Sequence, residues 1–473
     1  EGDPMNRVLY WRATGVLLIV GAVHLWGENI DLNIALKRAK ENSLELSSAL
    51  FQLRIDEARY RLAWRLYLPA VSLTYAQNDS VTYYGPDSRS RRIGVSLEQA
   101  VYDRGKRSQD IRSKESSLRL QQKLFAVQEE TLLLKVVTLY QEVLAYRLRK
   151  EIMESTLSIA REQARIGQEE LRLGEITEAD YLSILAQVKD LELEQSSLRR
   201  EESRVLFEFK KLIGRKEGEE IVLIGRIDPE YRGFVDREKE PFFLSEARKN
   251  STELEQQRIE LSSLRDTLRR EETAYIPEVS ARMELSMGGT EFPLTEPGFT
   301  IGVTFGWSTP IIPLSIGLSG GKEGLDQRSR GLNGQAGIAE NLENILSAEI
   351  VRTDLNRAQK GYETYLRDLE FQVRESLSAI SESAAALQIL KDKENILDRK
   401  QKILSLKVQM GEITRLTYVE GEIDLAKNRM EVLAAVTELF QRETSLLTLC
   451  GMNRFGTYPT PLIFPPMKGK DAP

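Results

Sequence analysis

The sequence contains one short stretch twice, and this repetition constrains the fold more than any other feature. Residues 173–182 read LGEITEADYL and residues 410–419 read MGEITRLTYV, with five of the ten positions identical. Each copy interrupts a long helical pattern. A glycine adopts the left-handed conformation that closes a helix at little cost, and a threonine three residues later can cap the next helix. The two stretches therefore predict two helical turn-backs.

A longer internal repeat surrounds these turn-backs. Residues 36–46 (LKRAKENSLEL) match residues 244–254 (LSEARKNSTEL) at an offset of 208 residues, and Tyr67-Leu68-Pro69 matches Tyr275-Ile276-Pro277 at the same offset. At the turn-backs the offset is 237. The chain therefore divides into a first repeat, residues 28–215, a linker, residues 216–241, and a second repeat, residues 242–451.

Each repeat has the same predicted order of elements. In the first, a helix over 32–67 ends before Pro69, and alternating apolar residues predict strands at 71–75 and 93–97, joined by a polar loop. A helix over 106–173 carries apolar residues at every seventh position, and 177–212 continues that period. At a rise of about 1.5 Å per residue, the longer helix extends roughly 100 Å, which the two shorter helices match when stacked end to end.

The second repeat contains strand patterns at 279–287 and 301–307, followed by a segment with no counterpart in the first. The difference between the two offsets is 29 residues, which fall within 308–337. Because this segment is rich in Gly and Ser, we expect a long loop or irregular structure there. The Pro-rich tail, residues 452–473, is expected to have little regular structure.

Composition excludes several classes of protein. The formal net charge of −6 gives no electrostatic support for a nucleic-acid partner. The only histidine is His24 and the only cysteine is Cys450. Histidine-based metal sites, Ser-His-Asp triads, Cys-His pairs and intramolecular disulfides are therefore excluded, and we expect no cofactor. Cys450 lies in an apolar helix end, where a buried thiol is the simplest expectation.

The N-terminal stretch is expected to direct secretion. Arg7 and Arg12 precede an apolar run from Thr14 to Val23, which is too short to span a bilayer as a helix. We interpret residues 5–27 as a signal peptide. A buried N-terminal helix is the alternative.

The predicted strands require neighbours. Four strands per chain leave open edges, and two, three or four copies would supply 8, 12 or 16 strands. The sequence does not choose among these numbers. The alternating apolar faces suit strands that contact lipid, although a soluble sandwich shows similar alternation.

Taken together, these motifs resemble the TolC-like outer-membrane efflux channels. The likeness rests on the duplicated helix, strand pair and long helical hairpin, the Tyr-Leu-Pro and Tyr-Ile-Pro motifs, the two Gly-Glu-Ile-Thr turns, and residues 101–106 (VYDRGK). The resemblance implies a mainly α-helical homotrimer, in which a 12-stranded β-barrel in outer-membrane lipid continues as a helical barrel in the periplasm. It also implies a channel rather than an enzyme.

The resemblance further implies partners. Such a channel is the exit duct of a tripartite efflux or type I secretion system. It receives substrates through a periplasmic adaptor from an inner-membrane pump of the RND, ABC or MFS type. The main alternative from another class is a periplasmic coiled-coil scaffold or adaptor, but that class has no need for duplicated strand pairs.

The resemblance also indicates candidate site residues at the turn-backs. The adaptor-docking tip corresponds to Gly174, Glu175, Ile176, Thr177, Gly411, Glu412, Ile413 and Thr414. The candidates for a periplasmic gate are Asp180, Arg415, Thr417 and Glu420. Thr417 occupies a position that is acidic in the family, and Ile413 a position that is basic there. Helix capping is the simpler role for Asp180, and a solvated helix face for Glu420.

Overall fold

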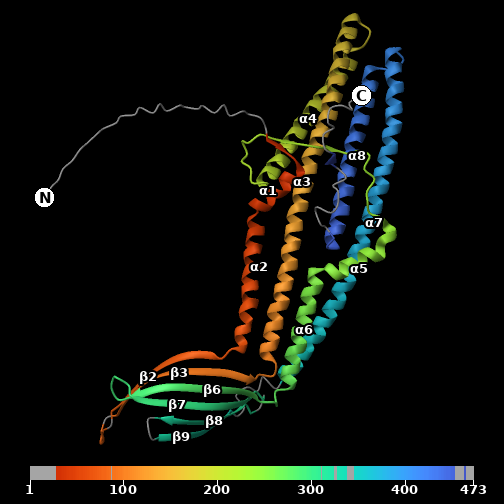
Figure 1. The fold of residues 1–473 in the computed structure, drawn as a ribbon. Coiled ribbons are helices and arrows are strands. Elements are labelled where there is room, and N and C mark those ends of the chain that lie inside the picture. The colour runs from red at the N-terminus through yellow and green to blue at the C-terminus, as the bar shows by residue number, and fades with distance from the viewer. Residues whose placement is uncertain are drawn as a thin grey trace, which may run out of the picture.

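The computed structural model is elongated, with a bundle of long helices and a β-sheet at one end (Figure 1). It describes residues 28–81, 83–86, 88–309, 312–323, 327–337, 346–452 and 463–464. The predicted signal peptide, with His24, lies outside the described residues, as does most of the tail.

The first repeat follows the predicted order of elements. Its elements are α1 (Leu32–Asn42), α2 (Leu44–Ala63), the 3₁₀ turn η1 (Trp64–Tyr67), β2 (Ala70–Ser80), β3 (Ser88–Tyr102), α3 (Lys106–Leu173) and α4 (Glu178–Leu212). Both α2 and α4 pack along α3, one at each end, so the predicted end-to-end arrangement is confirmed (Figure 1).

The second repeat has the same order with one addition. Its elements are η2 (Arg237–Lys239), α5 (Glu240–Asn250), α6 (Thr252–Glu272), β6 (Glu278–Gly289), β7 (Glu296–Trp307), β8 (Leu314–Glu323), β9 (Gln327–Ala336), α7 (Ser347–Gln409) and α8 (Arg415–Leu449). In the part of the chain that the structure describes, no helix is both long enough and apolar enough to cross a membrane.

The prediction of one continuous helix over 32–67 is wrong, because the chain breaks at Ser43. The hydroxyl of Ser43 accepts a hydrogen bond from the Leu46 amide at 3.1 Å and so starts α2 as a new helix. Ser251 does the same for Leu254 at 3.2 Å in the second repeat. The duplicated Asn-Ser pair was therefore a helix-start signal in the sequence.

The asparagine before each of these serines joins two helices. Asn42 donates to the carbonyl of Ile213 at 3.3 Å, and Asn250 donates to the carbonyl of Cys450 at 3.0 Å. Each bond satisfies a carbonyl at the end of a returning helix, which has no partner within its own helix. Each repeat thus contains the same type of helix–helix joint near the middle of the molecule.

We expected a long loop or irregular structure in the extra segment of the second repeat, but this segment forms a β-hairpin. Strands β8 and β9 pair with each other, and β8 pairs with β7 from Gly298 to Trp307. The sheet therefore has six antiparallel strands in the order β2-β3-β6-β7-β8-β9. The expectation of four strands per chain is wrong.

The linker between the repeats is held in place by short strands and a buried carboxylate. Strand β4 (Ile221–Leu223) pairs with β1 (Glu28–Ile30). Strand β5 (Arg226–Ile227) pairs with β10 (Ile463–Phe464), so the expected irregular tail contains a short strand. Further on, Glu443 of α8 accepts hydrogen bonds from the Phe234 amide at 2.7 Å and the Val235 amide at 2.8 Å, and from the Tyr231 hydroxyl.

The main hydrophobic core lies in the same middle region. It gathers side chains from α1, the middle of α3 and of α7, and the ends of α4 and α8, around the fully buried Tyr140, Phe209 and Leu439. Cys450 belongs to this core, as predicted, and burial raises the pKa of its thiol to about 12. The thiol is therefore protonated and unreactive at neutral pH.

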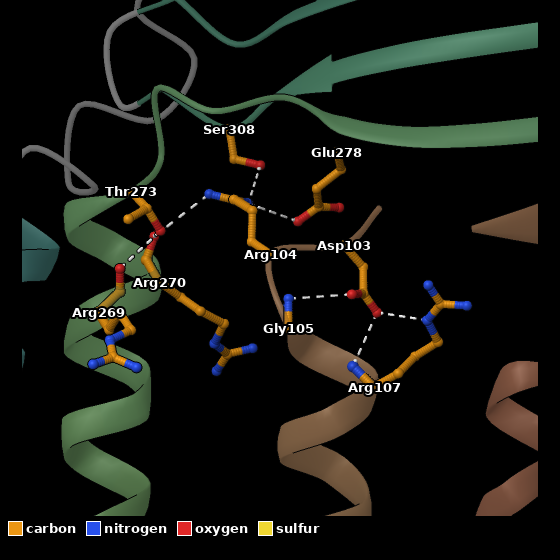
Figure 2. Close-up of polar contacts among 9 residues, drawn as sticks. All are labelled: Asp103, Arg104, Gly105, Arg107, Arg269, Arg270, Thr273, Glu278 and Ser308. Atoms are coloured by element: carbon orange, nitrogen blue, oxygen red, sulfur yellow. Dashed lines mark hydrogen bonds and ion pairs between the residues drawn. The ribbon is translucent and has the colours of Figure 1, made fainter. Parts of the chain in front are cut away.

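Arg104 joins the sheet to the helices (Figure 2). Its guanidinium donates to Glu278 of β6 at 2.6 Å, to the hydroxyl of Ser308 at 3.1 Å and to the carbonyl of Arg270 at 3.5 Å. Arg104 itself has a φ of 52°, and Gly105 a φ of 83°, so two left-handed residues turn the chain from β3 into α3. One side chain thereby links β6, the end of β7 and α6.

Asp103 stabilises the start of α3 beside this junction. Its carboxylate accepts from the Gly105 amide at 3.2 Å and from the backbone and side chain of Arg107 at 2.9 and 2.8 Å (Figure 2). Burial by itself raises the pKa of Asp103, but the hydrogen bonds and charge of Arg107 outweigh burial and lower it overall. An anionic side chain there also suits the positive end of the helix dipole.

Candidate functional site at the helical turn-backs

Both predicted turn-backs are present and have the same backbone geometry. Gly174 has a φ of 75° and Gly411 a φ of 74°. The next amide bonds back to the preceding helix in each case, from Glu175 to Glu170 at 2.9 Å and from Glu412 to Lys407 at 3.0 Å. These are the bonds of a Schellman motif, which a left-handed glycine permits.

The threonines cap the returning helices, as predicted. The Thr177 hydroxyl accepts from the Asp180 amide at 3.2 Å, and the Asp180 carboxylate accepts from the Thr177 amide at 3.3 Å, which completes a capping box. Thr414 likewise accepts from the Thr417 amide at 3.2 Å. Because Thr417 has no carboxylate, the second turn carries one negative charge fewer at this position.

A groove of about 640 Å³ lies between the two turn-backs. Six of the eight candidate docking residues line it, namely Glu175, Ile176, Gly411, Glu412, Ile413 and Thr414. Three of the four gate candidates line it too, namely Asp180, Arg415 and Thr417. The structure therefore brings the two duplicated motifs together around one groove, although they lie far apart in the sequence.

Arg415 joins the two helical hairpins across this groove. Its guanidinium forms a two-pronged ion pair with Glu170 of α3, with one bond of 2.7 Å, and donates to Gln163 at 2.9 Å. Only 21% of each partner's side chain is exposed in the ion pair. Within this chain, Arg415 thus contacts the end of α3, whereas the carboxylate of Asp180 contacts Thr177.

Sequence reasoning missed Glu170 and Gln163. These two residues are seven positions apart on α3, so they share one face of that helix. Such spacing identifies the face but not the helix that packs on it. Only the packing of α8 against α3 shows that this face meets Arg415.

Below the groove, the two hairpins share a small apolar core. Side chains of α3 and α4 pack there against Val419 and Ile423 of α8. The remaining gate candidate, Glu420, lies next to Val419 but is exposed. The periodicity of the helix places this carboxylate away from the apolar contact, where solvent or another chain can reach it.

At the opposite end of the molecule, the six-stranded sheet has one apolar and one polar face. The register of paired strands places a continuous set of apolar side chains on one face: Val71, Leu73, Tyr75, Ile93, Val95, Leu97, Val279, Met283, Leu285, Phe299, Ile301, Val303, Phe305, Trp307, Ile316, Leu318 and Leu332. Ser72, Thr74, Ser96, Glu98, Ser280, Arg282, Glu284, Thr300 and Thr304 lie on the other. Strands of membrane barrels alternate in this way, with the apolar face toward lipid.

Comparisons with known proteins agree with this arrangement. Residues 35–215 match the family described as outer membrane efflux protein. Among curated proteins, none matches this sequence.

Several solved outer-membrane channels have a similar fold. The channel CusC superposes with a TM-score of 0.71 at 13% identity, covering 89% of this chain and 91% of CusC. The outer membrane channel CmeC of Campylobacter jejuni gives 0.67 at 13% identity, covering 90% and 87%. The open state of the MtrE outer membrane channel of Neisseria gonorrhoeae gives 0.63 at 12% identity, covering 89% of both chains.

The resemblance predicted from the sequence is therefore confirmed. The chain resembles the outer-membrane efflux channels in sequence over residues 35–215 and in fold over most of its length. Its predicted location, in the outer membrane with a helical part in the periplasm, agrees with that match. So does its class, a channel rather than an enzyme.

Proposed function

We propose that three copies of this outer-membrane channel protein form the exit duct of a tripartite efflux or type I secretion system. The duct accepts substrates from an inner-membrane pump of the RND, ABC or MFS type through a periplasmic adaptor. One observation carries the proposal: a sheet with an apolar outer face continues into helices roughly 100 Å long, which end at two matched turn-backs. This is the shape required of a duct that links two membranes.

Exposed apolar side chains on the helices support assembly from several copies. Three isoleucines of α7 (Ile389, Ile396 and Ile403) and Met410, which directly follows the helix, repeat at every seventh position, and each is more than half exposed. A stripe with this spacing is typical of a helix that packs against another helix. Within one chain the stripe faces solvent, so a neighbouring copy is the partner that the proposed trimer supplies.

We assign the adaptor-docking role to the residues around the two turn-backs. The groove between them is lined by main-chain turns and by the side chains of Glu175, Ile176, Glu412 and Ile413. These residues lie at the free end of both hairpins, where an adaptor has access. Asp180, Arg415, Thr417 and Glu420 are proposed to contribute to the gate in the trimer.

The first test is the location and assembly of the protein. Detergent extracts of outer membranes are expected to contain a heat-resistant trimer, and the purified trimer is expected to conduct ions in a planar bilayer. Recovery of the protein in the soluble periplasmic fraction would instead favour the scaffold alternative.

The second test concerns transport. Deletion of the gene in its native host is expected to raise the cellular accumulation of substrates of the partner pump, and the wild-type chain is expected to restore efflux. Unchanged accumulation of a panel of dyes, metal ions and secreted proteins would contradict the proposed duct.

A further inference from the structure

The β8–β9 hairpin occupies the edge at which a four-stranded protomer would meet its neighbour. From this placement we infer that the trimer closes through β9 of one copy and β2 of the next, so that eighteen strands form the barrel. The inference rests on the proposed trimeric channel and changes the width of its membrane part.

The pairing of β7 carries the first step of the argument. All ten residues from Gly298 to Trp307 have partners on β8, and the other side of β7 is paired with β6. No backbone edge of this stretch remains for another chain. The open edges of the described sheet are β2 and β9, which have 11 and 10 residues. Unpaired edges of this length require a partner strand.

The direction of the strands permits this closure. Neighbouring strands in the sheet are antiparallel throughout, and six strands per copy is an even number. Strand β2 therefore runs away from the helices and β9 runs back toward them, so β9 of one copy is antiparallel to β2 of the next. Membrane barrels of this type are closed by antiparallel pairs.

The side chains of the hairpin continue the two faces of the sheet. Leu314, Ile316 and Leu318 of β8 lie beside Trp307, Phe305 and Val303 on the apolar face, and Leu332 of β9 follows. On the other face are Ser315, Ser319, Ser329, Asn333 and Gln335. A hairpin that lay outside the barrel would gain nothing from this alternation, whereas a barrel strand requires it.

Basic side chains lie at one end of the apolar face of the hairpin. Lys322, Arg328 and Arg330 lie on the same face as Leu318, at the end of the strands far from the helices. Long basic side chains at this level can place their charges in the polar layer of a membrane while their stems contact lipid. The hairpin is thus built to cross the apolar layer with its neighbours.

Eighteen strands would make a much wider mouth than twelve. With strands about 4.8 Å apart and tilted by about 40°, the backbone diameter is about 36 Å for 18 strands and about 24 Å for 12. The hairpin adds mostly small, uncharged side chains to the lumen.

Disulfide trapping between copies tests the closure. In a Cys450→Ser background, Leu332→Cys on β9 is combined in turn with Val71→Cys, Leu73→Cys and Tyr75→Cys on β2, so that neighbouring registers are covered. The two cysteines of one chain are separated by four intervening strands, so only a contact between copies can join them. We expect at least one combination to give covalent trimers in the outer membrane after mild oxidation.

A matched series uses Val303→Cys on β7 with the same three β2 partners. It is expected to give no covalent trimer in the full chain, and to give one when residues 314–336 are replaced by a short turn that frees β7. Covalent trimers from the Val303→Cys series in the full chain would overturn the inference. So would heat-resistant trimers in which no Leu332→Cys combination reacts.

The same experiment separates this inference from the proposed function. A heat-resistant, conducting trimer that crosslinks through β7 supports the duct but overturns the eighteen-stranded barrel. Absence of any trimer in the Cys450→Ser parent overturns both.

Discussion

Replacing Glu443 by alanine is expected to release the linker between the repeats from α8. Glu443 is fully buried and accepts hydrogen bonds from the amides of Phe234 and Val235 and from the hydroxyl of Tyr231. Glu443→Ala removes the acceptor from all three donors. A buried donor without an acceptor costs about 1–3 kcal/mol, and the low end of that range gives a total of about 3 kcal/mol.

This loss of free energy can be measured as an increase in the rate of local proteolysis. A loss of about 3 kcal/mol raises the population of the open linker by about 100-fold. Trypsin cleavage after Arg232, which is exposed and next to the anchored segment, is expected to accelerate by that factor in Glu443→Ala. Glu443→Gln keeps an acceptor for the two amides and should accelerate cleavage by less than about tenfold.

The control is Glu438→Ala, on the same helix. Glu438 forms an exposed ion pair with Arg442 and is not bonded to the linker, so cleavage after Arg232 should not change. Cleavage of Glu443→Ala at the wild-type rate would show that these three hydrogen bonds do not hold the linker against α8.

The same carboxyl also makes a prediction about pH. Burial raises the pKa of Glu443 above its ordinary value, although its hydrogen bonds act in the opposite direction. A carboxyl with a raised pKa binds its proton more readily in the folded state, so its contribution to stability falls as pH rises from about 4.5 through the folded pKa. The melting temperature of Glu443→Gln, measured against pH, should lack this fall; a curve parallel to that of the wild type would contradict it.

Further predictions concern the turn-backs. The double variant Gly174→Val, Gly411→Val should impair export, because a valine in the left-handed conformation costs about 1–2 kcal/mol at each position. Asn at both positions should be tolerated. Full export by an assembled double valine variant would count against adaptor docking there. Glu420→Gln should alter cation block or conductance in planar bilayers, and recordings identical to wild type would remove Glu420 from the gate. Arg415→Ala and Glu170→Ala should show a coupling of about 1 kcal/mol in thermal unfolding of the trimer. Strictly additive effects would mean that the ion pair does not join the hairpins.

Much of the fold could be predicted because the chain describes it twice. The bounds of α3 and the turn-backs follow from apolar residues at every seventh position and from one glycine in each turn. These signals are local, so no knowledge of distant contacts was needed to interpret them. The capping box at Thr177 was likewise contained within four residues.

The β8–β9 hairpin could not be predicted in the same way. Leu314, Ile316 and Leu318 do alternate, but the glycines around them suggested a loop. In the structure these strands gain their stability from ten pairs with β7 and from ten pairs with each other. Pairing of that kind depends on contacts between segments, which a local pattern does not contain.

The candidate site was predicted only in part, because some of its contacts also join segments that lie far apart in the sequence. The duplicated turns identified Gly174 and Gly411, but the partner of Arg415 depends on how α8 packs against α3. The family resemblance identified Asp180 and Arg415 only as gate candidates. The structure gives each of them a different partner within the chain.

The hairpin present in only one repeat also changes the symmetry of the proposed assembly. The two repeats present nearly equal turn-backs, so three copies offer six similar positions at the helical end, close to sixfold rotational symmetry. At the sheet end, the first repeat contributes two strands and the second contributes four. That end has threefold symmetry only. In the proposed trimer, a periplasmic partner would therefore meet six near-equivalent positions, whereas a ligand that recognises the mouth from outside the cell would meet three.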